Sequence, residues 1–245
     1  MRSITASRLR ERRKATYIFT VGVGEYAIIL LIKNSVPFET NVFINCPFDK
    51  DYVDILRPIL FCVLALGFEP RITLERSDSA ETRIDKIIGL IDDARFGIHD
   101  LSRLRAKRKG EYFRLNMPFE LGIDYACRRL RGPPWSSKKI LILEAERYRF
   151  QAAISDLSGS DIAAHKNEPV TACSEVRNWL AQELLDAPPG PAAIWGRFND
   201  FMADNFDVLT ARGYSNKDIA DQPIGELMDC MREWLGTHPA AVHVR

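Results

Sequence analysis

Short apolar runs alternate with amphipathic stretches between residues 41 and 145, and this alternation most limits what the chain can fold into. Strands that alternate with helices form parallel βαβ units, because each helix returns the chain across the sheet by a right-handed crossover. The pattern therefore predicts an α/β fold. We expect strands at 42–48, 68–74, 95–99 and 139–143, with helices at 49–66, 78–93 and 116–130.

The regions on either side of this pattern differ from it in character. Residues 1–40 are basic and then apolar, and residues 146–245 are mostly helical in pattern. The apolar run Tyr17–Ile32 resembles a membrane anchor in outline, but it contains Glu25 and is shorter than the roughly 20 residues of a spanning helix. We expect a peripheral strand or helix there. We expect residues 41–145 to form a flavodoxin-like parallel sheet with helices on both faces, carrying a C-terminal α-helical extension that is packed on it or linked to it.

Composition and charge exclude several classes of protein. The chain is 46% hydrophobic with a net charge of +1, which is typical of a folded domain and argues against a dedicated nucleic-acid binder. The five cysteines form no zinc-ligand pattern, so reduced thiols in the cytoplasm are expected. The short, interrupted apolar run argues against membrane association. The motifs of dinucleotide dehydrogenases, P-loop enzymes, serine hydrolases and zincins are absent from the sequence.

Polar residues follow the ends of the expected strands. In a parallel sheet the loops after the strands open at the same edge, so segments 45–49, 75–79 and 99–116 should converge. The last of these segments continues as a strongly basic loop, which could steer an anionic nucleotide to the site or remain a solvated surface. The edge where the three segments meet is therefore the expected ligand site.

The third of these loops begins with groups suited to a nucleotide. Asp100 could orient a ribose hydroxyl, while Ser102 and Arg103 could hold a phosphate. His99 is a weaker candidate for a general acid. Aspartate and serine also favour turns for local hydrogen-bonding reasons, so a purely structural role for these residues stays open.

Glu120 is the main candidate for chemistry. It lies near the start of the helix after the third strand, with Pro118 at an early helical position. The expected cap is Asn116 or Met117, of which Asn116 is the better chemical choice. A carboxylate there could offset the positive charge that develops on a sugar ring when a glycosidic bond breaks. It could equally be a glutamate that only complements the helix dipole. Spacing alone predicts an inward apolar face made by Phe119, Ile123, Ala126 and Leu130.

The chain resembles TIR-like and nucleoside deoxyribosyltransferase-like proteins in the segments Val42–Asp49, Phe96–Asp100 and Phe119–Gly122, and in the isoleucine-striped helix that precedes the second of them. The Asn-Cys-Pro-Phe-Asp start and the Asn-Met-Pro-Phe-Glu-Leu-Gly centre are also similar to those of a group of uncharacterised bacterial proteins. In the TIR-like and transferase groups, the glutamate that starts the helix after the third strand carries the glycosidic chemistry, and Glu120 occupies that position. The chain departs from the transferase pattern at Asp124, where alanine is usual.

The resemblance implies a TIR-like domain that cleaves the nicotinamide–ribose bond of NAD, in bacterial defence or signalling. NAD would be a substrate rather than a cofactor, no metal is implied, and activity would require self-association. Glu120 would be the catalytic residue, Phe48 would pack on a base, and Arg83 would meet the pyrophosphate. The full set of expected substrate contacts is Asn45, Pro47, Phe48, Asp78, Arg83, His99, Asp100, Ser102, Arg103, Asn116 and Phe119.

Two other functions remain open from the sequence. A module of the same fold could sense a nucleotide or bind a protein without turnover. A nucleoside deoxyribosyltransferase would instead exchange bases on deoxynucleosides, and the basic loop counts mildly against it, because that substrate carries no phosphate.

Overall fold

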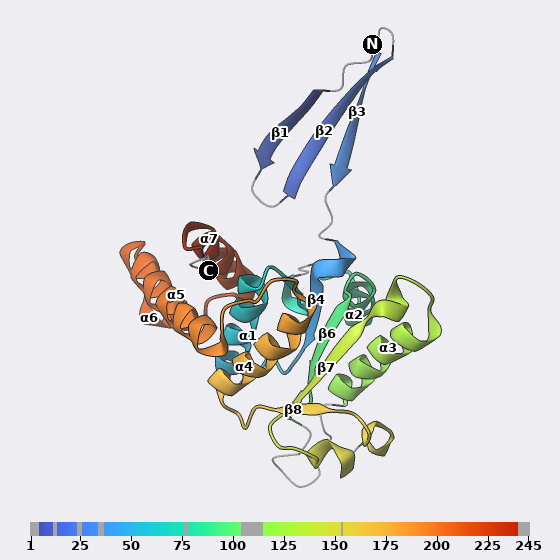
Figure 1. Cartoon of the computed structure of the whole chain (residues 1–245). Helices are drawn as coiled ribbons and strands as arrows, with labels where there is room; N and C mark the ends of the chain where they lie inside the picture. The colour runs from blue at the N-terminus through green and yellow to red at the C-terminus, as the bar shows by residue number, and fades with distance from the viewer. Residues whose placement is uncertain are drawn as a thin grey trace. The chain divides into compact units, whose positions relative to one another are not determined.

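The computed structural model describes residues 5–11, 14–23, 26–33, 37–75, 78–103, 115–152 and 154–239. Contacts within the chain divide it into two units, residues 1–37 and 38–245 (Figure 1). The basic loop 104–114 lies outside the described residues.

The first unit is a small antiparallel sheet. Its strands are β1 (Thr5–Glu11), β2 (Lys14–Val23) and β3 (Tyr26–Lys33), in that order across the sheet. The apolar run Tyr17–Ile32 thus contributes to two neighbouring strands instead of one continuous element. In the part of the chain that the structure describes, no helix has the length and apolar character needed to cross a membrane.

The second unit is built on a five-stranded parallel sheet. Its strands are β4 (Asn41–Asn45), β5 (Glu69–Arg71), β6 (Phe96–Asp100), β7 (Lys139–Glu144) and β8 (Ile162–Ala164). The order across the sheet is β5-β4-β6-β7-β8, and every neighbouring pair is parallel. Counted along the chain from β4, this order is 2-1-3-4-5, the flavodoxin-like arrangement. The expected α/β fold is confirmed.

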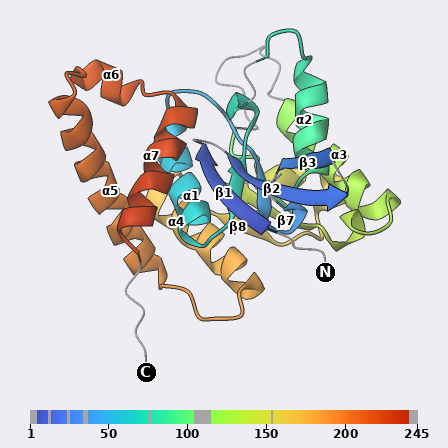
Figure 2. The ribbon, with the colours of Figure 1, turned by 90° about the horizontal axis from the view of Figure 1, so that it is seen from above.

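Helices cover both faces of this sheet (Figures 1 and 2). On one face α2 and α3 pack side by side, while α1 and α4 pack together on the other with α5 and α7 against α1. The helices are α1 (Val53–Ala65), α2 (Arg83–Asp92), α3 (Asn116–Leu130), α4 (Pro169–Leu180), α5 (Pro191–Ala211), α6 (Asn216–Ala220) and α7 (Ile224–Thr237).

The larger apolar core surrounds α1. One side of α1 packs on the sheet. The rest of the helix is buried because α4 lies beside it on the same face of the sheet, while α5 and α7 pack against it as well. The ring of Phe61 on α1 contacts the rings of Phe198 and Phe201 on α5. The C-terminal extension therefore belongs to the same core as the sheet.

Several element boundaries differ from those expected. The sheet continues beyond residue 145 with β8, a strand of three residues that is too short to give a clear alternating pattern. The helix expected to start at Asp78 begins at Arg83 instead, where the Thr82 side chain caps it by accepting a hydrogen bond from the Asp85 amide. The expected strand 68–74 is only Glu69–Arg71, followed by a short 3-10 helix.

Candidate functional site

The candidate site lies at the carboxyl ends of β4 and β6, which are neighbours in the sheet. The chain leaves β4 for α1 on one face and leaves β6 for α3 on the other, so the strand order reverses between them. In sheets of this type, ligands bind in the crevice outside the strand ends at such a point. Asn45 ends β4 and Asp100 ends β6.

Glu120 projects from the second turn of α3 and is only 3% exposed. Its Oε1 accepts a hydrogen bond of 3.2 Å from Nη2 of Arg83, at the start of α2. Burial raises the pKa of Glu120, and although the charge and hydrogen bond of Arg83 and the nearby His99 lower it, the balance stays above the ordinary value. The carboxyl group is thus held at the site edge by a partner from the first residue of α2.

A buried hydrogen-bonded path lies beside Glu120. Asn45 Nδ2 donates to Nδ1 of His99 at 3.0 Å and to the main-chain oxygen of Met117 at 3.0 Å. On its other side, His99 Nε2 lies 2.9 Å from Oδ2 of Asp124. The path joins β4, β6 and α3 directly beneath the site.

Lys138 completes this path from the turn before β7. Its Nζ lies 3.1 Å from Oδ1 of Asp124, and neither side chain is exposed. The ammonium group also donates to the main-chain oxygens of Ile91, at 2.8 Å, and Ala94. Burial alone raises the pKa of Asp124, but the bond and charge of His99, together with Lys138, hold it below its ordinary value.

Gly97 in β6 makes room for the pair of His99 and Asp124. A Cβ at this position would lie 2.1 Å from Asp124 Oδ2 and 3.1 Å from His99 Nε2. The first distance is impossible without movement of the carboxylate, so a residue with a side chain at position 97 would disrupt the pair. Glycine within a strand commonly marks such a close approach.

Asp100 accepts its hydrogen bonds from groups of the protein itself. The Tyr52 hydroxyl donates to Oδ2, the Ser102 amide donates to Oδ1 at 2.7 Å, and His165 Nε2 lies 3.0 Å from Oδ2. Burial raises its pKa, but His165, Ser102 and Tyr52 lower it below the ordinary value. The buried carboxylate thus ties β6 to the start of α1 and to the segment after β8.

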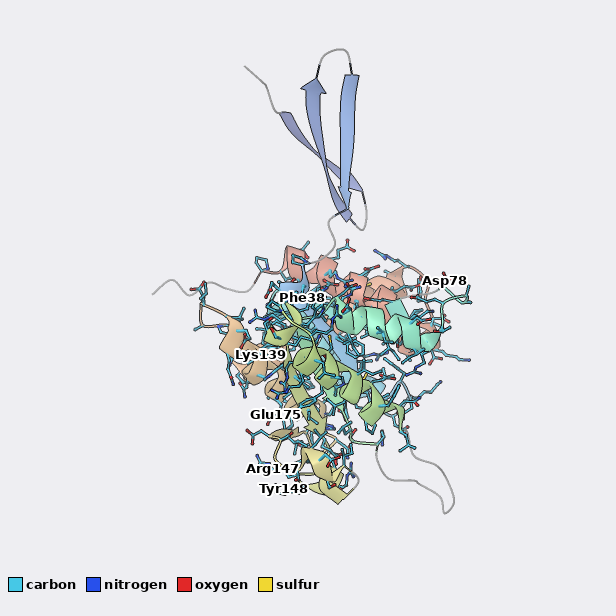
Figure 3. All side chains as sticks on the ribbon, turned by 90° about the vertical axis from the view of Figure 1, so that its right-hand side faces the viewer. Phe38, Asp78, Lys139, Arg147, Tyr148 and Glu175 are labelled. Carbon is cyan, nitrogen blue, oxygen red and sulfur yellow. The ribbon has the colours of Figure 1, made fainter. Side chains whose placement is uncertain are left out.

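The other residues expected at the site differ in burial and in their distance from it. Pro47 is buried, whereas Phe48 is partly buried and packs against the larger core. Arg103 Nη2 lies 3.8 Å from Asp49 Oδ1 at the site edge. Asp78 is exposed at the periphery of the unit, as Figure 3 shows.

The inward face expected for α3 is wrong at both of its ends, although Ile123 in its middle packs against a core cluster. Phe119 is 61% exposed and Leu130 is 84% exposed. The helix begins with Asn116 as its first residue, not as its cap, and the Asn116 side chain is exposed. The buried face consists of Met117, Glu120, Leu121, Asp124 and Cys127. Sequence spacing alone placed Glu120 and Asp124 off the buried face. It could not show that residues from other segments form hydrogen bonds and ion pairs with these carboxylates.

Sequence reasoning missed Lys138, Gly97 and the role of Asp124. The available signals were a carboxylate one helical turn after Glu120 and a glycine in the middle of a buried strand. Among the described residues, no group of three or more histidine, cysteine, aspartate or glutamate side chains is placed to hold a metal ion. The sequence matches no known protein-family model, and a comparison with curated proteins finds no relative.

Proposed function

We propose that this chain hydrolyses the N-glycosidic bond of a nucleotide, with NAD as the first substrate to test and Glu120 as the catalytic residue. One observation carries the proposal: a carboxylate that is 3% exposed is fixed at the carboxyl edge of the sheet, where the strand order reverses. Resemblance to TIR-like proteins supplies NAD as the candidate.

The reaction needs little more than charge stabilisation. When the bond between ribose C1′ and the nicotinamide nitrogen breaks, the nitrogen keeps the electron pair and nicotinamide leaves as a neutral molecule. Positive charge then develops on the ribose ring, and the carboxylate of Glu120 would stabilise it. Because nicotinamide leaves as a neutral molecule, it needs no donated proton. Water then adds to C1′ and releases its proton to the solvent.

Arg83 is suited to the anionic part of such a substrate. Its side chain is 55% exposed, so the guanidinium group reaches solvent while one nitrogen contacts Glu120. A guanidinium group binds phosphate oxygens in a bidentate manner. A pyrophosphate that engaged Arg83 would place the attached ribose near the Glu120 carboxylate.

The test is release of nicotinamide from NAD by the purified full-length chain over a series of protein concentrations, because assembly is part of the expectation. Glu120→Gln should reduce the rate at least about 100-fold, since it removes one electrostatic contact to the transition state. Glu226→Gln is the matched control, because Glu226 is exposed on α7. Equal rates for wild type and Glu120→Gln would end the assignment, as would absence of turnover at every concentration.

A second candidate is a nucleotide sensor without turnover. It is favoured by the pairing of Glu120 with Arg83, which already occupies the carboxylate in the structure. A thermal-shift measurement separates the two functions: a sensor is stabilised by NAD or ADP-ribose and releases no nicotinamide.

A further inference from the structure

The donors and acceptors of the buried path can be assigned one by one. Lys138 carries only donors, and its Nζ lies 3.1 Å from Asp124 Oδ1 in a buried ion pair, so this oxygen carries no hydrogen. The second oxygen of this ionised carboxylate accepts, so His99 Nε2 must carry the hydrogen and donate to it. His99 Nδ1 is then an acceptor, which matches the Asn45 Nδ2 that faces it. The path fixes the Nε2–H tautomer of His99.

This assignment also fixes the side-chain amide of Asn45. One Nδ2 hydrogen goes to His99 Nδ1 and the other to the Met117 main-chain oxygen, so both donors are used. The amide oxygen Oδ1 is left as an acceptor, and it has no hydrogen-bond partner among the residues that the structure describes. Asn45 is 2% exposed, and a buried polar atom without a partner needs an explanation.

We propose that Asp124 and Lys138 are positioning residues of the Glu120 site, which set the His99 tautomer and thereby present Asn45 Oδ1 to a hydroxyl or amide N–H of the bound ligand. Only the identity of that ligand rests on the proposed glycosidase function. Gly97 supports the inference independently, because its lack of a side chain is what allows the His99–Asp124 contact.

The substitution Asp124→Asn tests the inference because it reverses the path. The Lys138 ammonium group would donate a hydrogen bond to the single oxygen of the introduced amide. The amide nitrogen would then face His99. His99 would then have to accept at Nε2 and carry its hydrogen at Nδ1, and Asn45 would have to turn its oxygen toward the ring. The Asp-to-Asn change in a catalytic triad produces a wrong histidine tautomer in the same way.

Removal of Lys138 should reverse this effect. In the double variant Asp124→Asn with Lys138→Met, nothing competes for the oxygen of the introduced amide, which can again accept from His99 Nε2. A merely structural role for these residues predicts no such recovery of the tautomer. The double variant also removes both buried charges together, so it is expected to fold even if the single variant does not.

The experiment is long-range ¹H–¹⁵N NMR of histidine side chains in the full-length chain, with His99 assigned by through-bond correlation to its backbone. We expect Nε2–H in the wild type, Nδ1–H in Asp124→Asn, and Nε2–H again in the double variant. Asp207→Asn, at an exposed position on α5, is the control and should resemble the wild type. An Nδ1–H ring in the wild type would overturn the inference, as would an Nδ1–H ring in the double variant.

Ligand binding is measured in parallel with ADP-ribose as the probe. Its Kd should rise about tenfold or more in Asp124→Asn, because a ligand donor loses its buried acceptor, and should recover in the double variant. An unchanged Kd in Asp124→Asn despite the altered tautomer would overturn the presentation of Asn45 to the ligand. Expected tautomers together with no NAD cleavage would instead overturn the proposed function alone.

Discussion

Lys138 Nζ lies 3.1 Å from Asp124 Oδ1 in an ion pair that is closed to solvent on both sides. A charge that leaves water for a protein interior loses most of its solvation, so neither partner is stable there alone. Through His99, the same pair links the turn before β7 and the middle of α3 to the central strand β6. Its contribution can be separated from that of ordinary surface pairs by comparing two adjacent lysines.

Lys138→Met should lower the free energy of unfolding by about 3–5 kcal/mol, because it leaves the Asp124 carboxylate buried without its charged partner. Lys139→Met is the matched control. The Lys139 side chain is 50% exposed in its pair with Glu183, so its loss should cost less than about 1 kcal/mol. Urea denaturation of both variants measures the difference, and similar losses would show that Asp124 tolerates burial alone.

Gly97→Ala should destabilise the protein by about 1–3 kcal/mol or more, because the added Cβ collides with the Asp124 carboxylate. Gly122→Ala provides the opposite control on α3. A Cβ at this exposed helical position meets nothing within 4 Å, so the change should stabilise the protein by about 0.5–1 kcal/mol. Thermal and urea unfolding of the two variants would decide the matter, and a neutral Gly97→Ala would mean that the His99–Asp124 contact is easily displaced.

The stability of the protein should fall in acid partly because of Asp100. Hydrogen bonds from the protein hold its pKa below the ordinary value, which is about 3.9 in an unfolded chain. A lowered folded-state pKa means that the stabilisation is complete above about pH 4 and is lost as the pH falls toward the folded-state pKa.

Asp100→Asn should therefore be less stable at pH 7 and should lose less stability between about pH 4 and pH 2 than the wild type. Urea unfolding at a series of pH values measures both effects. Asp156→Asn, at an exposed position, should keep the wild-type dependence on pH. An Asp100→Asn variant with the same acid sensitivity as the wild type would place the titrating group elsewhere.

Arg83 should control the pH dependence of any glycosidase activity. The pKa of Glu120 is raised by burial and held down in part by Arg83. If the ionised carboxylate acts in catalysis, Arg83→Gln removes that opposing charge, so the acidic limb of kcat/KM should move to higher pH. Arg129→Gln, at an exposed position near the end of α3, should leave the profile unchanged. If the acidic limb of the kcat/KM profile does not move in Arg83→Gln, the group that titrates in this limb is not Glu120.

The sheet could be predicted from sequence because its strands are apolar runs separated by helical patterns. All five residues of β4 and of β6 are buried. A strand that is buried on both faces carries apolar residues without a polar alternation, and such a run is easily recognised in the sequence. The strand β8, with the sequence Ile-Ala-Ala, carries too little pattern to be recognised. Its place in the sheet depends on pairing with β7, which is a tertiary interaction.

The candidate site was predictable only in part. Asn45, His99 and Glu120 could be placed at one edge because parallel strands end together. The burial of Asp124 could not, because a carboxylate counts as a surface residue in any hydrophobic pattern until its partners are known. Here the partners come from β6 and from the turn before β7, and no local spacing connects those segments. Phe119 was expected on the buried face of α3 for the same reason: sequence spacing does not show which residues of other segments a helix packs against.

The packing of α4, α5 and α7 around α1 has a practical consequence for work on this protein. A chain shortened after β7 would retain four of the five strands and the Glu120 carboxylate but would uncover one side of α1, including Phe61. It would also lose His165, which contacts Asp100. The smallest unit that can report on the site therefore extends through α7, and inactivity of a shorter fragment would reveal a folding defect rather than a missing catalyst.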